Sequence, residues 1–121
     1  MTTEDGLPTW RYEEGATKGS WEGHSIGSDV SGFVVDAALG EGPSAHTHPY
    51  SETFIVLEGR GRFRYGDGFI EAEAGGIVVV PPDTAHGFTG LGPGKLRMVT
   101  IHASPRMETT WLEDSGGGEV S

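Results

Sequence analysis

The sequence has no cysteine, little basic charge and no long hydrophobic run, and each absence excludes a class of protein. Without cysteine there is no disulfide and no thiolate, so any metal must be held by histidine, carboxylate or water. Only 8 Lys and Arg stand against 18 Asp and Glu, and a net charge of -10 disfavours a nucleic-acid partner. No apolar run approaches the ~20 residues that span a bilayer, and no basic amphipathic stretch favours a membrane surface.

The two ends of the chain are polar. The N-terminus, MTTEDGLPTW, lacks the apolar segment of a signal peptide, so we expect a soluble cytoplasmic protein. Residues 1–20 are expected to form a loose N-terminal arm, and residues 113–121, a glycine-rich polar stretch, a disordered tail. Residues 21–112 are then long enough for one domain.

Glycine and proline separate many short runs that read as strands. The chain holds 21 Gly and 7 Pro, which disfavours long helices. Strands are predicted at residues 30–40, 52–59, 77–82, 85–90 and 95–105, with a hairpin over 61–76 and an edge strand over 106–113. This pattern predicts an all-β sandwich or barrel.

Three of these runs carry further expectations. If Lys95 and Arg97 face water, alternation turns the set Leu96, Met98, Thr100 and His102 inward. Residues 77–82 are a continuous apolar run, typical of a strand that is buried on both faces or lies at an interface. With the edge strand near the C-terminus, this run favours a homodimer formed by pairing of edges. Arg62 and Arg64 are expected on the outer face, paired with Glu58, Glu71 or Glu73.

The chemistry-bearing residues begin at His46-Thr47-His48. In an extended segment, two histidines one residue apart present both imidazoles on one face, and a bend after them lets Glu52 return a carboxylate to that side. A lone pair of this kind is also typical of a polar surface loop. A β-barrel can bring His86 alongside. Three imidazoles and one carboxylate suit a divalent transition metal such as Fe, Mn, Ni, Co, Cu or Zn, and leave two octahedral positions open.

The spacing of these residues resembles the cupin superfamily. Its first motif, G-x5-H-x-H-x3-E-x6-G, is matched in every position from Gly40 to Gly59. Its second motif, G-x5-P-x-G-x2-H-x3-N, is matched by Gly75, Pro81 and His86, whereas Asp83 replaces a glycine and Gly90 replaces the asparagine. Neither departure removes a ligand, and Asp tolerates the positive φ of a turn better than most residues do.

The resemblance implies a double-stranded β-helix, or jelly-roll barrel, with a metal near the floor of a pocket that is open at one end. It assigns the metal ligands to His46, His48, Glu52 and His86. Alternation alone adds three candidates for the apolar lining of the pocket: Phe54, Val56 and Phe88. Plain core packing is the alternative for these three residues.

Two further residues are candidates for catalysis. His102 is predicted either to face the pocket, as a donor to the ligands or a general base, or to be a satisfied histidine at a strand end. Tyr50 follows the histidine pair and is predicted either to reach a substrate or to cap the mouth of the barrel. His24 lies in a glycine-rich loop and is expected to be exposed.

These residues favour a metal-dependent enzyme that acts on a small organic substrate. An oxygenase-type oxidoreductase of the dioxygenase kind, with Fe(II) as the favoured metal, is the leading hypothesis, since dioxygen and a chelating substrate can share the open positions. One alternative is a non-catalytic binding or sensory protein. Another is a metal-dependent isomerase or lyase, although such reactions need a strong base and the only lysines are Lys18 and Lys95.

Overall fold

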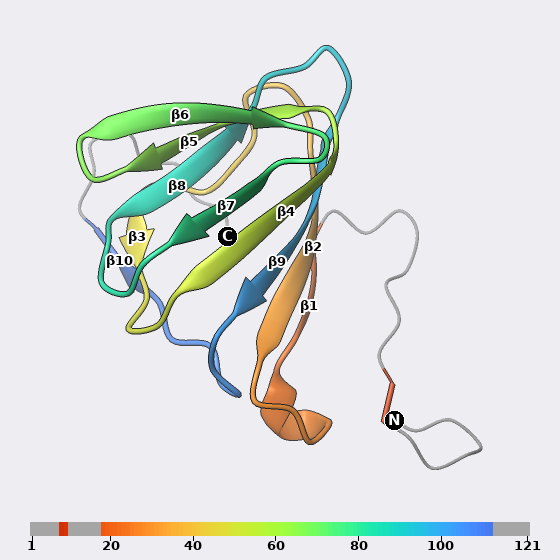
Figure 1. The fold of residues 1–121 in the computed structure, drawn as a ribbon, viewed down its shortest axis with the longest axis vertical. Helices are drawn as coiled ribbons and strands as arrows, with labels where there is room; N and C mark the ends of the chain where they lie inside the picture. The colour runs from red at the N-terminus through yellow and green to blue at the C-terminus, as the bar shows by residue number, and fades with distance from the viewer. Residues whose placement is uncertain (1–7, 10–17, 113–121) are drawn as a thin grey trace.

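The computed structural model describes residues 8–9 and 18–112, and they fold into two facing antiparallel sheets (Figure 1). The first sheet has the order β1 (Lys18–Trp21), β2 (Ser31–Ala37), β9 (Leu96–His102), β4 (Glu52–Glu58) and β7 (Ile77–Val80). The second has the order β10 (Thr110–Trp111), β3 (His46–Thr47), β8 (His86–Gly90), β5 (Arg60–Tyr65) and β6 (Gly68–Glu73). The predicted all-β double-stranded β-helix is confirmed.

The core fills the space between the two sheets, and alternation along the strands decides which side chains enter it. Every second residue of β9, beginning at Leu96, is buried, and β4 follows the same rule from Glu52 to Val56. The prediction that Leu96, Met98, Thr100 and His102 face inward is therefore confirmed. The buried hydrophobic cluster consists of Val35, Ala37, Phe54, Val56, Phe63, Val78, Val80, Leu96 and Met98.

The predicted hairpin is formed by β5 and β6. Tyr65 pairs with Gly68, so Gly66 and Asp67 make a two-residue turn, the kind that glycine and aspartate favour. On its outer face Arg62 approaches Glu71, as expected, at 3.7 Å between Nη2 and Oε2. Both side chains are about half exposed, so the pair adds little to stability.

One position in each motif lies in a turn with a left-handed backbone conformation. Gly59 has a φ of 79° and lies so close to Lys95 that a Cβ would meet its carbonyl oxygen at 2.3 Å. Asp83 has a φ of 59°, the left-handed conformation that aspartate tolerates, and its N–H donates to the His48 carbonyl at 2.8 Å. The replacement of glycine by Asp83 therefore keeps the turn.

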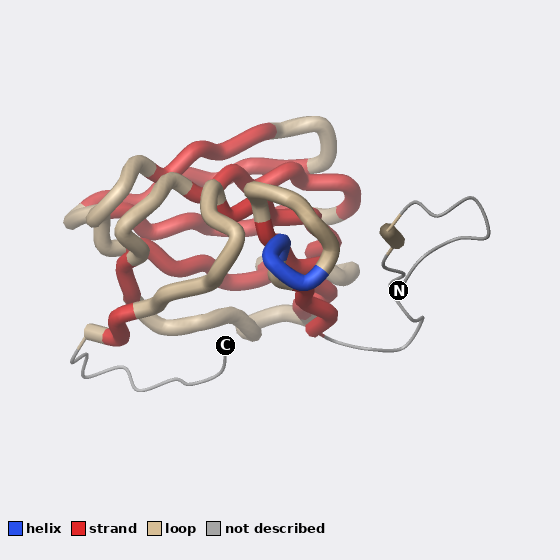
Figure 2. The backbone as a smooth tube through the Cα atoms, turned by 90° about the horizontal axis from the view of Figure 1, so that it is seen from below, coloured by secondary structure: helices blue, strands red, loops and turns tan. Residues whose placement is uncertain are grey.

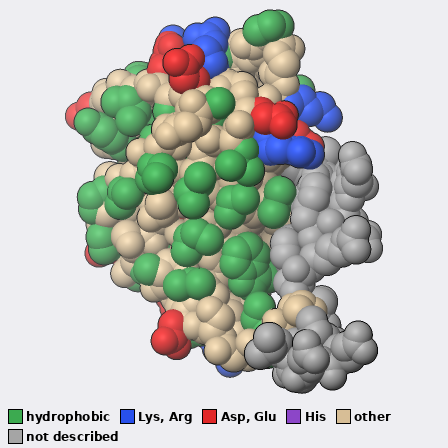
Figure 3. Space-filling view, turned by 45° about the vertical axis from the view of Figure 1, so that its right-hand side comes forward, with side chains coloured by type: hydrophobic (Ala, Val, Ile, Leu, Met, Phe, Trp, Pro, Cys, Tyr) green, Lys and Arg blue, Asp and Glu red, His purple; other side chains and the backbone are tan. Residues whose placement is uncertain are grey.

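The strand β7 lies at the edge of the first sheet, and this corrects one expectation. Val78 and Val80 are buried, but Ile77 and Val79 are 65 % and 59 % exposed, so the run is not buried on both faces. Alternation sends Ile77 and Val79 to the outer face of the sheet, where the described residues form no further layer. Figure 3 shows hydrophobic side chains spread over the outer face of the first sheet. The interface between copies stays a prediction.

Loops cross the end of the barrel that is seen from below, and the short 3-10 helix η1 (Gly23–Ser25), which carries the exposed His24, lies at the same end (Figure 2). The first sheet begins at Lys18, within the range expected for the N-terminal arm, and the expected tail over 113–121 lies outside the described residues. Within the described part of the chain, no helix has the length and apolarity that a membrane span requires.

Candidate metal centre

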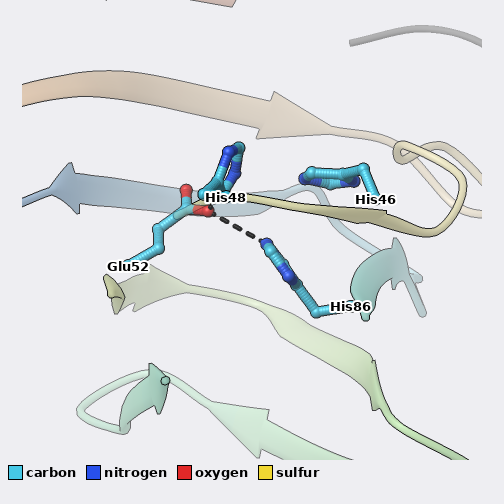
Figure 4. Close-up of side chains that lie close together, drawn as sticks. All are labelled: His46, His48, Glu52 and His86. Carbon is cyan, nitrogen blue, oxygen red and sulfur yellow. Dashed lines mark hydrogen bonds and ion pairs between the residues drawn. The ribbon is translucent and has the colours of Figure 1, made fainter. Parts of the chain in front are cut away.

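The four residues predicted to bind metal meet at one end of the space between the sheets. His46 lies on β3, His86 opens β8 as the cross-strand partner of His46, and Glu52 opens β4. His48 follows β3 in the turn. Their side chains point toward one another (Figure 4), and one potential ligand atom from each lies within 4.8 Å of all the others. All four are buried, with His46 the most exposed at 7 %.

Backbone carbonyls fix the orientation of the three imidazoles. The Nδ1 atom of His46 lies 2.8 Å from the Ser44 oxygen, and that of His86 lies 2.9 Å from the Thr84 oxygen. The Nδ1 atom of His48 lies 2.8 Å from the carbonyl oxygen of Glu108. A carbonyl only accepts, so each Nδ1 carries the proton. A ring that carries its proton on Nδ1 can present the lone pair of Nε2 to a metal, which is the form that a metal binds.

Glu52 brings its carboxylate between these rings. Its Oε1 lies 3.1 Å from Nε2 of His48 and 3.2 Å from Nε2 of His86. Its Oε2 lies 3.0 Å from Nε2 of His102. Burial alone would raise the pKa of Glu52, but the imidazoles of His102, His48 and His86 outweigh it and hold that pKa well below its usual range. The carboxylate is therefore ionised and able to bind a cation.

The donor set fits a divalent transition metal. Nε2 of His48 is buried and has no hydrogen-bond partner, although it lies 3.1 Å from Oε1 of Glu52, and a metal would use its lone pair. Burial lowers the pKa of His46 to about 4, so that ring is neutral at pH 7. Ligands on opposite sides of one metal lie about 4 Å apart, which agrees with the spread of the cluster. This buried cluster of His and Glu could hold a metal ion.

His102 and Tyr50 lie directly beside the cluster, which settles where both side chains point. The Tyr50 hydroxyl is 2.7 Å from Nδ1 of His102, and both side chains are buried. Burial raises the pKa of the Tyr50 phenol, so the hydroxyl keeps its proton. His102 thus contacts Glu52 on one side and Tyr50 on the other. It is the last residue of β9, and its side chain faces the cluster.

The three candidate lining residues lie next to the cluster or deeper in the core. The Phe54 ring centre is 6.1 Å from that of His86, and Phe54 is 2 % exposed. Phe88 packs against Phe54 at 5.9 Å between ring centres. Val56 is one pleat further along β4 and belongs to the hydrophobic cluster. Phe54 is therefore the apolar neighbour of the ligands, whereas Val56 and Phe88 fit the core-packing alternative.

One part of the centre has no counterpart in the predictions from sequence. The segment after β9 passes beside His48 and Tyr50 through Glu108, and Trp111 on β10 lies with its ring centre 4.8 Å from that of His46. The contacts at Glu108 come from main-chain atoms, which carry no sequence signal. The only signal for this segment was the edge strand expected over 106–113, and β10 confirms that strand in a shorter form.

Comparisons with known proteins agree with this architecture. A protein with a double-stranded β-helix domain from Klebsiella pneumoniae, 23 % identical, matches with a TM-score of 0.70 over 94 % of this chain and 97 % of that one. Oxalate decarboxylase from Bacillus subtilis gives a TM-score of 0.70 at 17 % identity over 77 % of this chain and 26 % of that one. At these identities the likeness shows the fold alone.

Sequence comparison adds a relative and a family. Over 79 residues the chain is 38 % identical to a Streptomyces cyaneus protein described as polyketide synthase CurC, covering 63 % of this chain and 51 % of that protein. The match thus spans about half the length of this curated relative. The model of the cupin domain family matches residues 33–102, which include all four residues of the cluster and His102. The chain belongs to the cupin domain family.

Proposed function

We propose that this chain is a metal-dependent enzyme that acts on a small organic substrate, with His46, His48, Glu52 and His86 as the metal ligands. The observation that carries this proposal is the common orientation of the three imidazoles: each Nδ1 atom faces a carbonyl, and the Nε2 atoms of His48 and His86 face the carboxylate. Burying such polar groups costs free energy unless they are paired. A metal-binding role explains why they are gathered in the interior.

The reaction that we propose is an oxygenase-type oxidation with Fe(II). Fe(II) bound at this centre would supply Lewis acidity and electrons for dioxygen chemistry. With four protein ligands, a bound metal would keep open positions that dioxygen and an oxygen atom of the substrate could share. The relative described as a polyketide synthase supports carbonyl-rich or phenolic molecules as the substrate class. Phe54 would keep water from the inner side of the centre.

His102 and Tyr50 are the residues that we propose to handle protons. The Tyr50 hydroxyl can donate to Nδ1 of His102, and Nε2 of His102 lies against Oε2 of Glu52. The pair can thus hold a proton at Nδ1 or release it to a substrate oxygen nearby. This observation also favours a second candidate, a metal-dependent isomerase or lyase, because those reactions move a proton without consuming dioxygen.

Oxygen uptake distinguishes these functions. Metal-free protein is loaded anaerobically with Fe(II), and uptake is followed with catechol and with a 1,3-diketone as probes. The proposal expects uptake that requires Fe(II), the probe and Glu52, so that Glu52→Ala abolishes it. Turnover of a probe by Mn(II)- or Zn(II)-loaded protein without oxygen uptake would replace the oxygenase with the isomerase or lyase. Tight binding of probes with no turnover under any metal would show a binding or sensory protein.

A further inference from the structure

The segment that follows β9 forms a C-terminal strap, which comprises residues 105–112 and ends in β10 and Leu112. The match to the cupin domain family ends at residue 102, so the strap lies outside the matched region. Its side chains are mostly exposed, and burial in the core does not explain its position. Main-chain hydrogen bonds hold it, and those of Glu108 run to His48 and Tyr50 at the metal centre.

The strap supplies the hydrogen-bond acceptor for Nδ1 of His48, whereas the other two histidines find this acceptor in their own segments. Nδ1 of His46 and Nδ1 of His86 bond to carbonyls two residues upstream in their own segments. Nδ1 of His48 bonds instead to the carbonyl of Glu108, 60 residues away, at 2.8 Å. The hydroxyl of Thr109 lies 3.3 Å from the same nitrogen. The tautomer and ring orientation of one metal ligand therefore depend on a remote segment.

The same strap residue also fixes Tyr50. The N–H of Glu108 donates to the Tyr50 hydroxyl at 3.1 Å, and that hydroxyl lies 3.3 Å from the Glu108 carbonyl. The Tyr50 ring is stacked on the His48 ring, with 5.1 Å between ring centres and 6° between planes. His48 is thus held at its nitrogen by the strap and at its face by a ring that the strap also holds.

Farther along the strap, Trp111 covers a second ligand. Trp111 is the cross-strand partner of His46, and partners in an antiparallel pair point to the same side of the sheet. Its indole lies 4.8 Å from the His46 ring and is 49 % exposed. The indole is therefore a wall between His46 and solvent at the edge of the second sheet. The strap contacts two of the three imidazoles of the centre.

Besides the bond that the His24 N–H donates to the Pro105 carbonyl at 2.9 Å, two anchors that a substitution can remove lie near the ends of the strap. The N–H of Met107 donates to Oε2 of Glu22 at 2.8 Å, and this bond lowers the pKa of Glu22. The N–H of Leu112 donates to the carbonyl of Ala45 at 3.1 Å. Each anchor can be removed without changing a ligand or a residue that contacts a ligand. The strap can therefore be loosened by substitution in the full chain.

We propose that the C-terminal strap is a working part of the metal centre, in which the main chain of Glu108 positions His48 and Trp111 walls off His46. The inference rests on the metal binding in the proposed function and adds positioning residues to it. Its consequence is that metal affinity depends on strap docking while the four ligands stay unchanged. Positioning groups behind metal ligands typically change affinity by about 10- to 100-fold when they are lost.

The test uses the full chain with Co(II) as the probe and a chromophoric chelator as the competitor. Combining Glu22→Ala with Leu112→Pro removes both anchors, and the Co(II) dissociation constant is expected to rise by about 10- to 100-fold. Thr110→Ala is the matched control, because this side chain is exposed and the substitution keeps the main chain of the strap, so the affinity is expected to stay at the parent value. Glu22→Gln keeps an acceptor oxygen and is expected to restore most of the affinity in the Leu112→Pro background.

The tautomer of His48 distinguishes a strap that positions this ligand from a strap that only stabilises the fold. Nitrogen NMR of the Zn(II)-loaded parent is expected to show a single Nδ1–H tautomer there, and the double variant a mixture. Parent-like Co(II) affinity in the double variant overturns the strap proposal and leaves the proposed function intact. A parent that binds no Co(II) overturns both. Should the double variant fail to fold, Glu22→Ala alone is judged by the same criterion.

Discussion

The interior of the barrel has two ends that are built by the same strands and differ in chemistry. The inward residues of β4 and β9 form three cross-strand pairs, which change from polar to apolar along the strands: Glu52 with His102, Phe54 with Thr100, and Val56 with Met98. At the ligand end the groups are ionised or hydrogen-bonding. At the apolar end Leu96 and Met98 are fully buried hydrophobic side chains. Along each strand, the residues that could bind a metal are thus followed within four positions by residues that only pack in the hydrophobic core.

The comparison teaches that the ligand end can be built because the apolar end supplies the folding free energy. Burial of hydrophobic surface contributes about 25 cal/mol per Å². Burial of a carboxylate among imidazoles contributes little or is unfavourable. Even the middle pair shows the transition, since Oγ1 of Thr100 is buried without a hydrogen-bond partner. Substitutions at the two ends should therefore have different consequences.

The largest effect is expected at Glu52. Glu52→Ala removes the carboxylate that lies against two of the other ligands, so bound metal should fall from about one per chain to below about a tenth. His48→Ala should act likewise, and in both variants the metal-free fold should persist because the apolar end is intact. Elemental analysis with circular dichroism measures this. Glu71→Ala, at an exposed carboxylate, is the control. Full occupancy in Glu52→Ala and His48→Ala would show that the ligand assignment is wrong.

The opposite pattern is expected at Leu96, which has 0 % exposure. Leu96→Ala leaves a cavity at the apolar end and should lower the free energy of unfolding by about 2–5 kcal/mol. The metal content of the folded fraction should not change. Urea unfolding of the metal-free protein measures the first effect and elemental analysis the second. Leu39→Ala, at 69 % exposure, should change the unfolding free energy by less than about 0.5 kcal/mol. Loss of metal in folded Leu96→Ala would mean that the two ends are not separable.

Acid should lower the free energy of unfolding of the metal-free protein, because His46 and Glu52 at the ligand end have lowered pKa values. Burial lowers the pKa of His46 to about 4 from 6.5, so between these values the unfolded chain binds a proton that the folded chain does not. Stability from this residue then falls as the pH falls, by up to about 1.4 kcal/mol per pH unit. The lowered pKa of Glu52 extends the loss below its usual value of 4.5.

His46→Gln is expected to flatten this dependence between pH 6.5 and about 4 while leaving the loss at lower pH. Urea unfolding of chelator-treated protein at several pH values measures the slopes. A slope in His46→Gln equal to that of the parent would show that the ring is not held neutral by burial.

A smaller effect is expected at His102, whose Nε2 lies 3.0 Å from the carboxylate and whose ring centre lies 4.6 Å from that of His48. His102→Leu should weaken metal affinity by about tenfold without changing stoichiometry, because Oε2 of Glu52 loses its neighbour. Tyr50→Phe keeps the ring that is stacked on His48, so this substitution should weaken metal affinity less than His102→Leu does. Competition with a chelator measures both, and His24→Leu is the control, since that histidine is exposed. Loss of all metal in His102→Leu would make His102 a fifth ligand.

Much of the ligand end could be predicted from the sequence because its information is local. The spacing of His46, His48 and Glu52 predicts that their side chains lie on the same side, and alternation along one strand predicts that His102 points inward. What His102 meets depends on the register of β4 against β9, which joins residues about 50 positions apart and has no local signal. The contact of His48 with Glu108 uses a carbonyl that every residue possesses. Remote main-chain contacts are therefore what the sequence could not show.

The outer face of the first sheet offers the last comparison with the interior. The same strand, β7, sends Val80 inward at 3 % exposure and Val79 outward at 59 %. Val79→Lys should therefore change the unfolding free energy by less than about 0.5 kcal/mol and leave metal content alone. If two copies pair through this edge strand, as the apolar run 77–82 predicts, the substitution should instead convert a dimer to a monomer in light scattering. Leu39→Lys, an exposed apolar position on another segment, should leave the dimer in place. A parent that is monomeric at every concentration would contradict the predicted homodimer without touching the metal centre, because no ligand lies on this face.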